Sequence, residues 1–315
     1  MGRVLVTRQL PAGGLDLLAG HELVGPKPAD APYSSAELFA LAPTVDAVVS
    51  LLTDVIDEPL LAAGASGRLR IVANVAVGYN NIDVAAASRL GVLVTNTPGV
   101  LDETTADTAF LLILAASRLA HEAEEDLRSG RWPGWGINQY LGLDVHGATL
   151  GIVGYGRIGR AVARRATGFA MNVLHHSRTP TGEDGYVADL DDLLARCDIV
   201  SLHTPLTTET THLIDARRLA LMPDHAVLVN TSRGPVVDES ALADALHAGR
   251  LFAAGIDVFE HEPTVHPRLL TAPRAVLLPH IGSGSRATRL RMARIAADNI
   301  AAVLAGRPPL HPVNP

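Results

Sequence analysis

The stretch TLGIVGYGRIGRAVARRA, residues 149–166, decides the fold of this chain. Its apolar run ends at Gly154, and Gly156 and Gly159 then complete the spacing G-x-G-x-x-G, while a helical pattern starts at Arg157. In a strand–turn–helix unit the first glycine allows a tight turn, the second lets a pyrophosphate approach the backbone, and the third lets helix and strand pack closely. The free N–H groups and the dipole at the start of the helix favour the phosphates. The stretch therefore predicts a dinucleotide-binding unit.

Short apolar runs alternate with helical patterns along the rest of the chain. Before the glycine motif they cover residues 3–7, 46–52, 70–77 and 91–96. They restart at 148–154 and continue at 171–176, 197–203, 226–232, 251–258 and 275–281. Such alternation predicts parallel strands joined by crossover helices. Because the pattern restarts, we expect an α/β fold with two parallel sheets.

Two longer amphipathic segments complete the expected helices. Residues 102–130 have acids near their start, apolar spacing through their middle and Gly130 at their end, which predicts one long helix linking two domains. Residues 285–306 form a second segment, closed by Pro308 and Pro309. This terminal helix is expected to pack back on the first domain.

Composition and charge exclude several classes of protein. The 315 residues carry a formal net charge of −7, without a cluster of Lys and Arg interleaved with aromatics, which argues against a nucleic-acid partner. No run of about 18 uncharged apolar residues predicts a membrane span, and the amino end enters a strand pattern rather than a signal peptide, so the cytoplasm is expected. The single cysteine, Cys197, permits no internal disulfide and is predicted to be a buried structural thiol. Small molecules are the expected partners.

Three segments of the second half offer the groups that a carbonyl-reducing nicotinamide enzyme needs. These groups are a cation for the substrate, a proton donor, and a partner that sets the pKa of the donor. Arg233 in NTSRG, Glu262 in DVFEHEP and His280 in LLPHIGSGS each follow an apolar run. Ligands of open α/β sheets bind at the carboxyl ends of strands. Alone, each residue is equally well a surface arginine, a solvated glutamate or a strand-capping histidine; together they predict a reductase site.

The order of motifs resembles the D-isomer-specific 2-hydroxyacid dehydrogenases, and within them the glyoxylate and hydroxypyruvate reductases. The motifs in order are SLLTDVID, VAVGYNNID, NTPGVLDETTAD, GRWPGW, GIVGYGRIG, SRT, HTPLTTET, LVNTSRGPVVDE, GIDVFEHEP and LPHIGS. The resemblance implies two Rossmann-like domains: a flavodoxin-like substrate domain from residues 1–99 and 287–315, and a dinucleotide-binding domain, 100–286, inserted in it. It assigns catalysis to Arg233, Glu262 and His280, with Glu260 only a neighbour.

The resemblance also implies how the site works. Arg233 holds the carboxylate and carbonyl oxygens of a 2-keto acid, and protonated His280 supplies the proton as hydride reaches the carbonyl carbon. Glu262 orients His280 and favours its imidazolium form, so that reduction weakens as the pH rises. Backbone N–H groups of Val77 and Gly78 bind the substrate carboxylate from the other domain, across a cleft whose closure excludes water. The expected cofactor contacts are Gly154, Gly156, Arg157, Ile158, Gly159, Ser177, Arg178, Thr179, His203, Thr204, Pro205, Thr231, Ser232, Asp257 and Gly282.

The segment LHHSRTP, residues 174–180, bears on the choice of nucleotide. Ser177 falls 18 residues after Gly159, where an NAD-selective site carries an acid for the ribose hydroxyls, and the nearest acid is Glu183. We expect Arg178 to pair with a 2′-phosphate and the hydroxyls of Ser177 and Thr179 to add hydrogen bonds. This predicts NADPH as the preferred cofactor, with NADH possible; the alternative is an ordinary polar turn that ends at Pro180.

Other functions are weighed against this one. The sequence HEPTVH, residues 261–266, does not match a zinc helix, since its histidines are five apart with a proline between them, so no metal is expected. Phosphoglycerate is a weaker substrate candidate, because no regulatory domain and no basic phosphate pocket stand out. A nucleotide-sensing binding protein with incidental activity is a further alternative. Leu51 and Leu52, with Trp135, suggest a small apolar substrate pocket, and the resemblance implies a homodimer formed through the Trp132–Trp135 loop and the helix before it.

Overall fold

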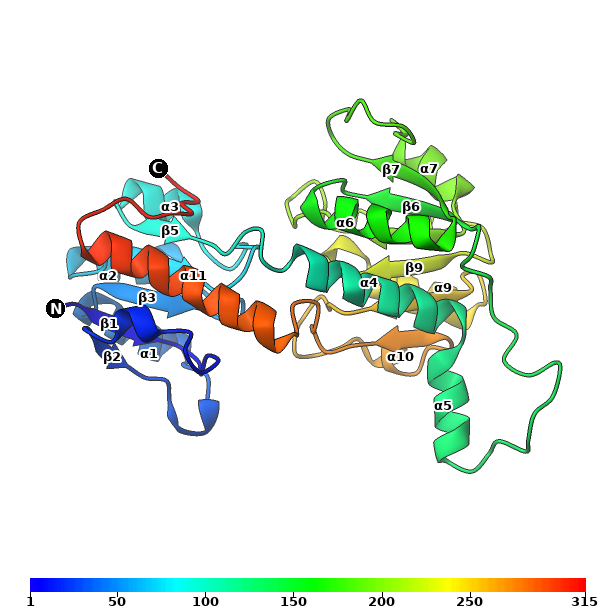
Figure 1. Cartoon of the computed structure of the whole chain (residues 1–315), viewed down its shortest axis with the longest axis horizontal. Coiled ribbons are helices and arrows are strands. Elements are labelled where there is room, and N and C mark those ends of the chain that lie inside the picture. The colour runs from blue at the N-terminus through cyan, green and yellow to red at the C-terminus, as the bar shows by residue number, and fades with distance from the viewer. The chain divides into compact units, whose positions relative to one another are not determined.

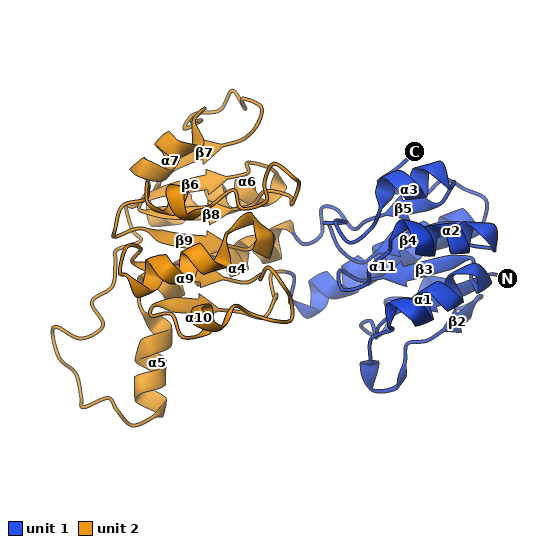
Figure 2. Cartoon of the chain, turned by 180° about the vertical axis from the view of Figure 1, so that it is seen from behind, with its two compact units in different colours: residues 1–101, 283–315 blue, residues 102–282 orange.

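The computed structural model describes all 315 residues, which form two compact units (Figure 2). Unit 1 consists of residues 1–101 and 283–315, and unit 2 of residues 102–282. The chain therefore leaves unit 1 once, builds unit 2 and returns. The sequence had placed these two crossings at 99/100 and 286/287.

Unit 1 is built on a five-stranded parallel sheet with the order β2-β1-β3-β4-β5, the flavodoxin-like order. Its strands are β1 (Arg3–Val6), β2 (Glu22–Val24), β3 (Ala47–Ser50), β4 (Ile71–Asn74) and β5 (Leu93–Thr95). Its helices are α1 (Ser35–Leu41), α2 (Glu58–Ser66), α3 (Val84–Arg89) and α11 (Arg286–Leu304), with 3-10 turns η1 (Asp16–Leu18), η2 (Pro28–Asp30) and η3 (Ala42–Thr44). The sequence pattern did not predict β2, because this three-residue edge strand is only partly covered and lacks an apolar run.

The carboxyl end of the chain completes unit 1. Helix α11 packs against β3, β4 and η1, as expected of the terminal helix. Beyond it, the side chain of Asn314 accepts a hydrogen bond from the N–H of Val94 at 2.7 Å and donates one to the carbonyl of Val92 at 2.9 Å. The last residues are thereby fixed to the edge of the sheet at β5.

Unit 2 contains a six-stranded parallel sheet with the order β11-β10-β9-β8-β6-β7 (Figure 1). Its strands are β6 (Thr149–Val153), β7 (Asn172–His176), β8 (Ile199–Leu202), β9 (Val227–Asn230), β10 (Ala253–Ile256) and β11 (Ala275–Leu277). Its helices are α4 (Asp102–Ser117), α5 (Ala120–Arg128), α6 (Arg157–Ala166), α7 (Leu190–Arg196), α8 (Ala216–Leu219), α9 (Glu239–His247) and α10 (Pro267–Leu270), with 3-10 turns η4 (Thr167–Phe169) and η5 (Gly234–Val236). The chain order reverses between β6 and β8, and the carboxyl ends of these strands form the switch point where open α/β sheets bind ligands.

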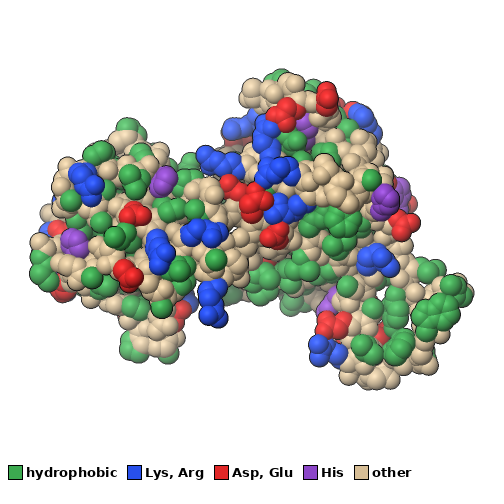
Figure 3. Space-filling view, viewed as in Figure 1, with side chains coloured by type: hydrophobic (Ala, Val, Ile, Leu, Met, Phe, Trp, Pro, Cys, Tyr) green, Lys and Arg blue, Asp and Glu red, His purple; other side chains and the backbone are tan.

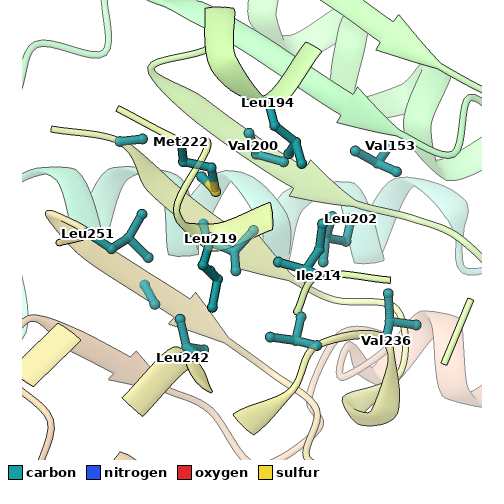
Figure 4. Packing of buried hydrophobic residues seen from close by; sticks show 14 of the residues in the cluster. Val153, Leu194, Val200, Leu202, Ile214, Leu219, Met222, Val236, Leu242 and Leu251 are labelled. Carbon is teal, nitrogen blue, oxygen red and sulfur yellow. The ribbon is translucent and has the colours of Figure 1, made fainter. Parts of the chain in front are cut away.

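Apolar side chains cover both faces of this sheet. Helices α4 and α6 lie against one face, and α7 to α10 cover the other, whose core is drawn in Figure 4. Val200 of β8, Leu194 of α7, Leu219 of α8 and Leu242 of α9 belong to this one buried cluster. Because both faces are buried, the central strands read as unbroken apolar runs rather than as alternating patterns.

The predicted single helix over residues 102–130 is wrong, since α4 ends at Ser117 and α5 starts at Ala120. Leu119, between them, has a left-handed φ of 52°. The returning chain explains the break: the N–H of Leu143 donates to the carbonyl of Ser117 at 2.8 Å, and Gly142 lies against the same carbonyl. With that acceptor engaged the helix changes direction, and α5 with the loop after it extends away from the sheet (Figure 1).

Candidate active site

The glycine motif forms a tight turn at the switch point of the unit 2 sheet. Gly154 ends β6 with a φ of +95°, and a Cβ at this residue would lie 2.6 Å from the backbone of His203, which follows β8. A Cβ on Gly159 would lie 2.3 Å from the carbonyl oxygen of Gly154, whereas one on Gly156 would meet nothing within 4 Å. Two glycines therefore allow close packing, and the middle one leaves open space beside the backbone.

The start of α6 fits a dinucleotide pyrophosphate. Gly156 occupies the N-cap position, so no side chain caps the first N–H groups, and Arg157 rather than an acid follows it. The hydroxyl of Thr204, in the segment that packs on Gly154, is buried without a hydrogen-bond partner. Uncapped N–H groups and an unsatisfied hydroxyl are groups that a bound phosphate or ribose satisfies. The residues present thus fit the cofactor that the motif implies.

His203 is held as a neutral side chain at the carboxyl end of β8. Its Nε2 lies 2.8 Å from the hydroxyl of Ser201, and its Nδ1 lies 3.5 Å from that of Thr231. Burial lowers the pKa of His203 to about 3, so that the imidazole carries no charge at neutral pH. The next residues are fixed as well, since the carbonyl of Pro205 accepts from the hydroxyl of Thr210 at 2.7 Å. His203 therefore links β8 to Thr231 as a neutral side chain.

His280 and Glu262 form a hydrogen-bonded pair beyond the ends of β11 and β10. The Nδ1 of His280 lies 2.8 Å from Oε2 of Glu262, and Oε1 of Glu262 accepts from the N–H of Phe259 at 3.1 Å. Burial raises the pKa of Glu262, but the bonds from His280 and Phe259 and the charges of His280 and Arg233 outweigh it, and the pKa falls below its ordinary value. An ionised carboxylate can only accept a hydrogen bond, so Nδ1 of His280 carries the proton of this bond. The other ring nitrogen, Nε2, is therefore the one available to exchange a proton with a ligand.

Arg233 lies close enough to Glu262 for the two charges to interact. Burial lowers the pKa of Arg233 and the charge of Glu262 opposes that shift, and the guanidinium stays protonated near neutral pH. Its Nη1 donates to the carbonyl of Ser232 at 2.7 Å. The structure thus gathers the three residues predicted as catalytic at one edge of the unit 2 sheet, where β9, β10 and β11 end.

The turn that carries Arg233 is fixed by Asn230, at the end of β9. Asn230 is 1% exposed, and its Oδ1 accepts from both the N–H of Ser232 at 3.0 Å and the hydroxyl of Ser232 at 2.7 Å. Its Nδ2 donates to the carbonyl of Arg233 at 2.9 Å. Gly234 then lies against the neighbouring chain, because a Cβ there would be 1.9 Å from the carbonyl carbon of Phe259. This close approach brings the Arg233 turn beside the segment that carries Glu262.

Asp257 fixes the turn that carries His280. His280 has a left-handed φ of 53°, a conformation that non-glycine residues seldom adopt, and its N–H donates to the carbonyl of Asp257 at 2.8 Å. The two carboxylate oxygens of Asp257 accept from the N–H groups of Ile281 and Gly282, both at 2.7 Å. Burial raises the pKa of Asp257 above its ordinary value, although these two bonds oppose the shift. Asp257 thus holds the backbone around His280, and its role as a cofactor contact stays a prediction.

The segment after β4 in unit 1 presents two backbone donors. The carbonyls of Val77 and Gly78 accept from the side chains of Asn96 at 2.8 Å and Asn74 at 2.9 Å, respectively. Neither N–H group of these two residues donates to another residue. Both residues are partly exposed, so that unit 1 offers two free N–H groups side by side.

Comparison with known proteins identifies the family. The family model of the D-isomer specific 2-hydroxyacid dehydrogenase NAD binding domain matches residues 110–282. A glyoxylate reductase of Korarchaeum cryptofilum is 48% identical, over 99% of this chain and 96% of the relative. This chain belongs to the D-isomer specific 2-hydroxyacid dehydrogenase family.

Solved structures agree with this family. A protein from Thermus thermophilus is 44% identical with a TM-score of 0.92, over 99% of each chain. An NADPH-dependent glyoxylate/hydroxypyruvate reductase from Sinorhizobium meliloti, solved with NADP and malonate, is 37% identical with a TM-score of 0.86, over 99% of this chain and 96% of that one. The chain is therefore an NAD(P)-dependent 2-hydroxyacid dehydrogenase with the predicted α/β fold of two parallel sheets.

The loop that the sequence predicts to select the nucleotide follows β7. Arg178 and Thr179 are exposed there, whereas the hydroxyl of Ser177 donates to the carbonyl of Thr179 at 2.7 Å. Glu183, the nearest acid in sequence, is engaged by Arg160 of α6. The loop thus presents one guanidinium that no acid of the loop engages, and the hydroxyl of Ser177 serves the turn itself.

Three other features that the sequence raised are a cysteine, a metal site and a membrane span. Cys197 is fully buried, and burial raises the pKa of its thiol to about 12. No group of three or more His, Cys, Asp or Glu side chains is arranged to hold a metal ion. None of the helices has both the length and the apolar character to cross a membrane.

Nothing in the sequence pattern singles out Asn230, Asn74 or Asn96, because a buried asparagine that binds backbone leaves no spacing signal.

Proposed function

We propose that this dehydrogenase uses NADPH to reduce a small 2-keto acid, glyoxylate or hydroxypyruvate, to the D-2-hydroxy acid. The observation that carries the proposal is the His280–Glu262 pair beside Arg233, at the ligand-binding edge of the dinucleotide sheet. The names of the relatives, glyoxylate reductase and NADPH-dependent glyoxylate/hydroxypyruvate reductase, support the substrate class.

The residues of the site divide the reaction among them. Arg233 binds the carboxylate and polarises the carbonyl of the keto acid through its forked guanidinium, which a lysine does not reproduce. The bound nicotinamide supplies the hydride. His280 donates the Nε2 proton to the oxygen that gains negative charge, and Glu262 keeps the ring oriented through Nδ1. The N–H groups of Val77 and Gly78 supply two further donors for the substrate carboxylate.

The cofactor is held by the glycine turn and the start of α6. The N–H groups from Arg157 to Gly159 would hold the pyrophosphate, and the buried, unpartnered hydroxyl of Thr204 would supply a further hydrogen bond to the cofactor. Arg178 binds the 2′-phosphate that distinguishes NADPH from NADH. The absence of an acid at Ser177 supports this preference, since a carboxylate there would repel the phosphate.

The protein is further proposed to form a homodimer through α5 and the loop after it. Leu127, Trp132, Ile137 and Leu141 are exposed there, and Trp135 is 81% exposed. Figure 3 shows apolar side chains gathered on this projecting part of unit 2. Exposed apolar patches of this kind mark association surfaces. The double substitution of Trp132 and Trp135 by serine is expected to yield monomers in sedimentation analysis; dimers of unchanged stability would refute the surface.

A substrate and cofactor panel tests the proposed function. The purified protein is assayed with glyoxylate, hydroxypyruvate, pyruvate and phenylpyruvate, each with NADPH and with NADH. We expect turnover of the first two with NADPH, and at least a hundredfold loss of kcat in His280→Ala, on the order expected for removal of a general acid. Cofactor binding without turnover of any keto acid would instead identify a nucleotide-sensing protein.

A further inference from the structure

We propose that Glu239 is a positioning residue for the reduction, because its buried carboxylate holds both ends of the segment that carries Glu262. The inference rests on the proposed function of the His280–Glu262 pair. Glu239 binds the backbone at both ends of residues 260–266 and acts through that segment.

The carboxylate of Glu239 binds two backbone N–H groups on either side of Glu262. Glu239 is the first residue of α9 and is only 5% exposed. Its Oε1 accepts from the N–H of Glu260, and its Oε2 accepts from the N–H of His266 at 3.2 Å. These donors lie two residues before and four residues after Glu262, so that one side chain fixes the separation of the two ends of the segment.

The side chain of Glu260 completes the arrangement from the opposite direction. Its Oε1 accepts from the N–H of Glu239 at 2.7 Å, and its Oε2 lies 3.2 Å from Nε2 of His212. The two carboxylates are tolerated near each other because each binds N–H groups, and because the start of α9 favours negative charge. Glu260 is thereby engaged by Glu239 and His212, which leaves the pairing with His280 to Glu262.

The clamped segment leaves Glu262 little freedom. Between the two fixed ends, Oε1 of Glu262 accepts from Phe259 and Oε2 contacts His280. The backbone of Phe259 also lies directly against Gly234, so that the segment has no room to retreat on that side. The position of the carboxylate relative to His280 therefore depends on the bonds that Glu239 makes. A glutamine in place of Glu239 has one acceptor oxygen, and its amide would turn a donor toward a second N–H group.

The test compares Glu239→Gln and Glu239→Ala with the control Asp244→Asn, an exposed acid of the same helix that pairs with Arg268. We expect kcat for keto-acid reduction to fall about tenfold in Glu239→Gln and about tenfold further in Glu239→Ala, because hydrogen bonds to a charged acceptor are lost. The Kd of NADPH should stay unchanged, and the basic limb of the kcat/KM profile should move to lower pH. Asp244→Asn should match the wild type in all three measurements.

A double-mutant cycle separates positioning from general structural damage. If Glu239 acts through Glu262, adding Glu239→Gln to Glu262→Gln causes no further loss of kcat. Multiplied losses in the double variant, or an unchanged pH profile in Glu239→Gln, would overturn the proposal. Glu239→Gln replaces Glu239→Ala in the cycle because it is closest in shape and best able to fold.

A spectroscopic measurement makes the result independent of turnover. The proton on Nδ1 of His280, bonded to Glu262, should give a low-field NMR signal that Glu262→Gln abolishes and Glu239→Gln weakens or shifts. An unchanged signal in folded Glu239→Gln protein would overturn the positioning role. A wild-type protein that shows this signal but reduces no keto acid would refute the proposed function instead.

Discussion

Replacing Gly234 by alanine introduces a single methyl group where two backbone segments touch. A Cβ at this position would lie 1.9 Å from the carbonyl carbon of Phe259, 2.0 Å from its oxygen and 2.4 Å from the nitrogen of Glu260. Ordinary contacts of a Cβ lie between 3.4 and 4 Å, so the two segments must separate by about 1.5 Å. None of these three contacts is with a flexible side chain, and the displacement must pass to the backbone on both sides.

The separation would move Arg233 away from Glu262 and His280. A misplacement of about 1 Å in a catalytic group costs about a hundredfold in rate, and overpacking costs about 1–3 kcal/mol of stability. We therefore expect kcat/KM for glyoxylate with NADPH to fall at least about a hundredfold in Gly234→Ala, with a Tm lowered by a few degrees.

The matched control for this variant is Gly168→Ala, also in unit 2. A Cβ at Gly168 meets nothing within 4 Å, and its φ lies outside the left-handed region. This variant should keep the rate and the Tm of the wild type. If Gly234→Ala retained both as well, the close approach of the two segments would have no role in holding the catalytic residues together.

Three further outcomes can be measured on the same protein. Burial opposes ionisation of Glu262, yet the bond from His280 keeps its pKa below the ordinary value of 4.5, so its contribution to stability is complete above that value and is lost as the pH falls through the folded-state pKa. In urea unfolding the free energy of unfolding of the wild type should thus exceed that of Glu262→Gln at pH 7, and this difference should shrink as the pH falls below 4.5; a constant difference would refute the pairing. Ser177→Asp should shift kcat/KM toward NADH by about tenfold or more, and an unchanged ratio would remove Arg178 from nucleotide selection. Cys197, with its pKa raised to about 12, should react with a thiol reagent at pH 8 only after unfolding, and rapid reaction of the folded protein would contradict its burial.

The parts of the fold that the sequence predicts are those with a periodic or spaced signal. Runs such as 226–232 and 251–258 are apolar because the strands are covered on both faces, and they match β9 and β10. The glycine spacing from Gly154 to Gly159 is visible because backbone contact at two of these positions excludes any side chain. The prediction fails for elements that lack such a signal. Strand β2, for example, is too short and too exposed to show an apolar pattern.

The break between α4 and α5 illustrates the same limit. The amphipathic spacing of residues 102–130 continues through Leu119, and no proline or glycine interrupts it. What ends α4 is a hydrogen bond from Leu143, a residue distant in the chain, to the carbonyl of Ser117. A helix boundary set by a tertiary contact leaves no mark in the local sequence.

The same reasoning explains why the proposed catalytic residues are more visible in the sequence than the residues that hold them. Arg233, Glu262 and His280 stand out because each is an ionisable residue that follows an apolar run within a few residues. Their supports act through backbone atoms: Asn230 binds the carbonyl of Arg233, Asp257 binds two N–H groups after His280, and Glu239 binds N–H groups on either side of Glu262. Backbone groups exist at every residue, so the chain sequence does not say which of them a buried carboxylate or amide will bind. Each of the three proposed catalytic residues therefore has one buried polar residue that binds the backbone at or near it, and the geometry of the site depends on these supports as much as on the three residues themselves.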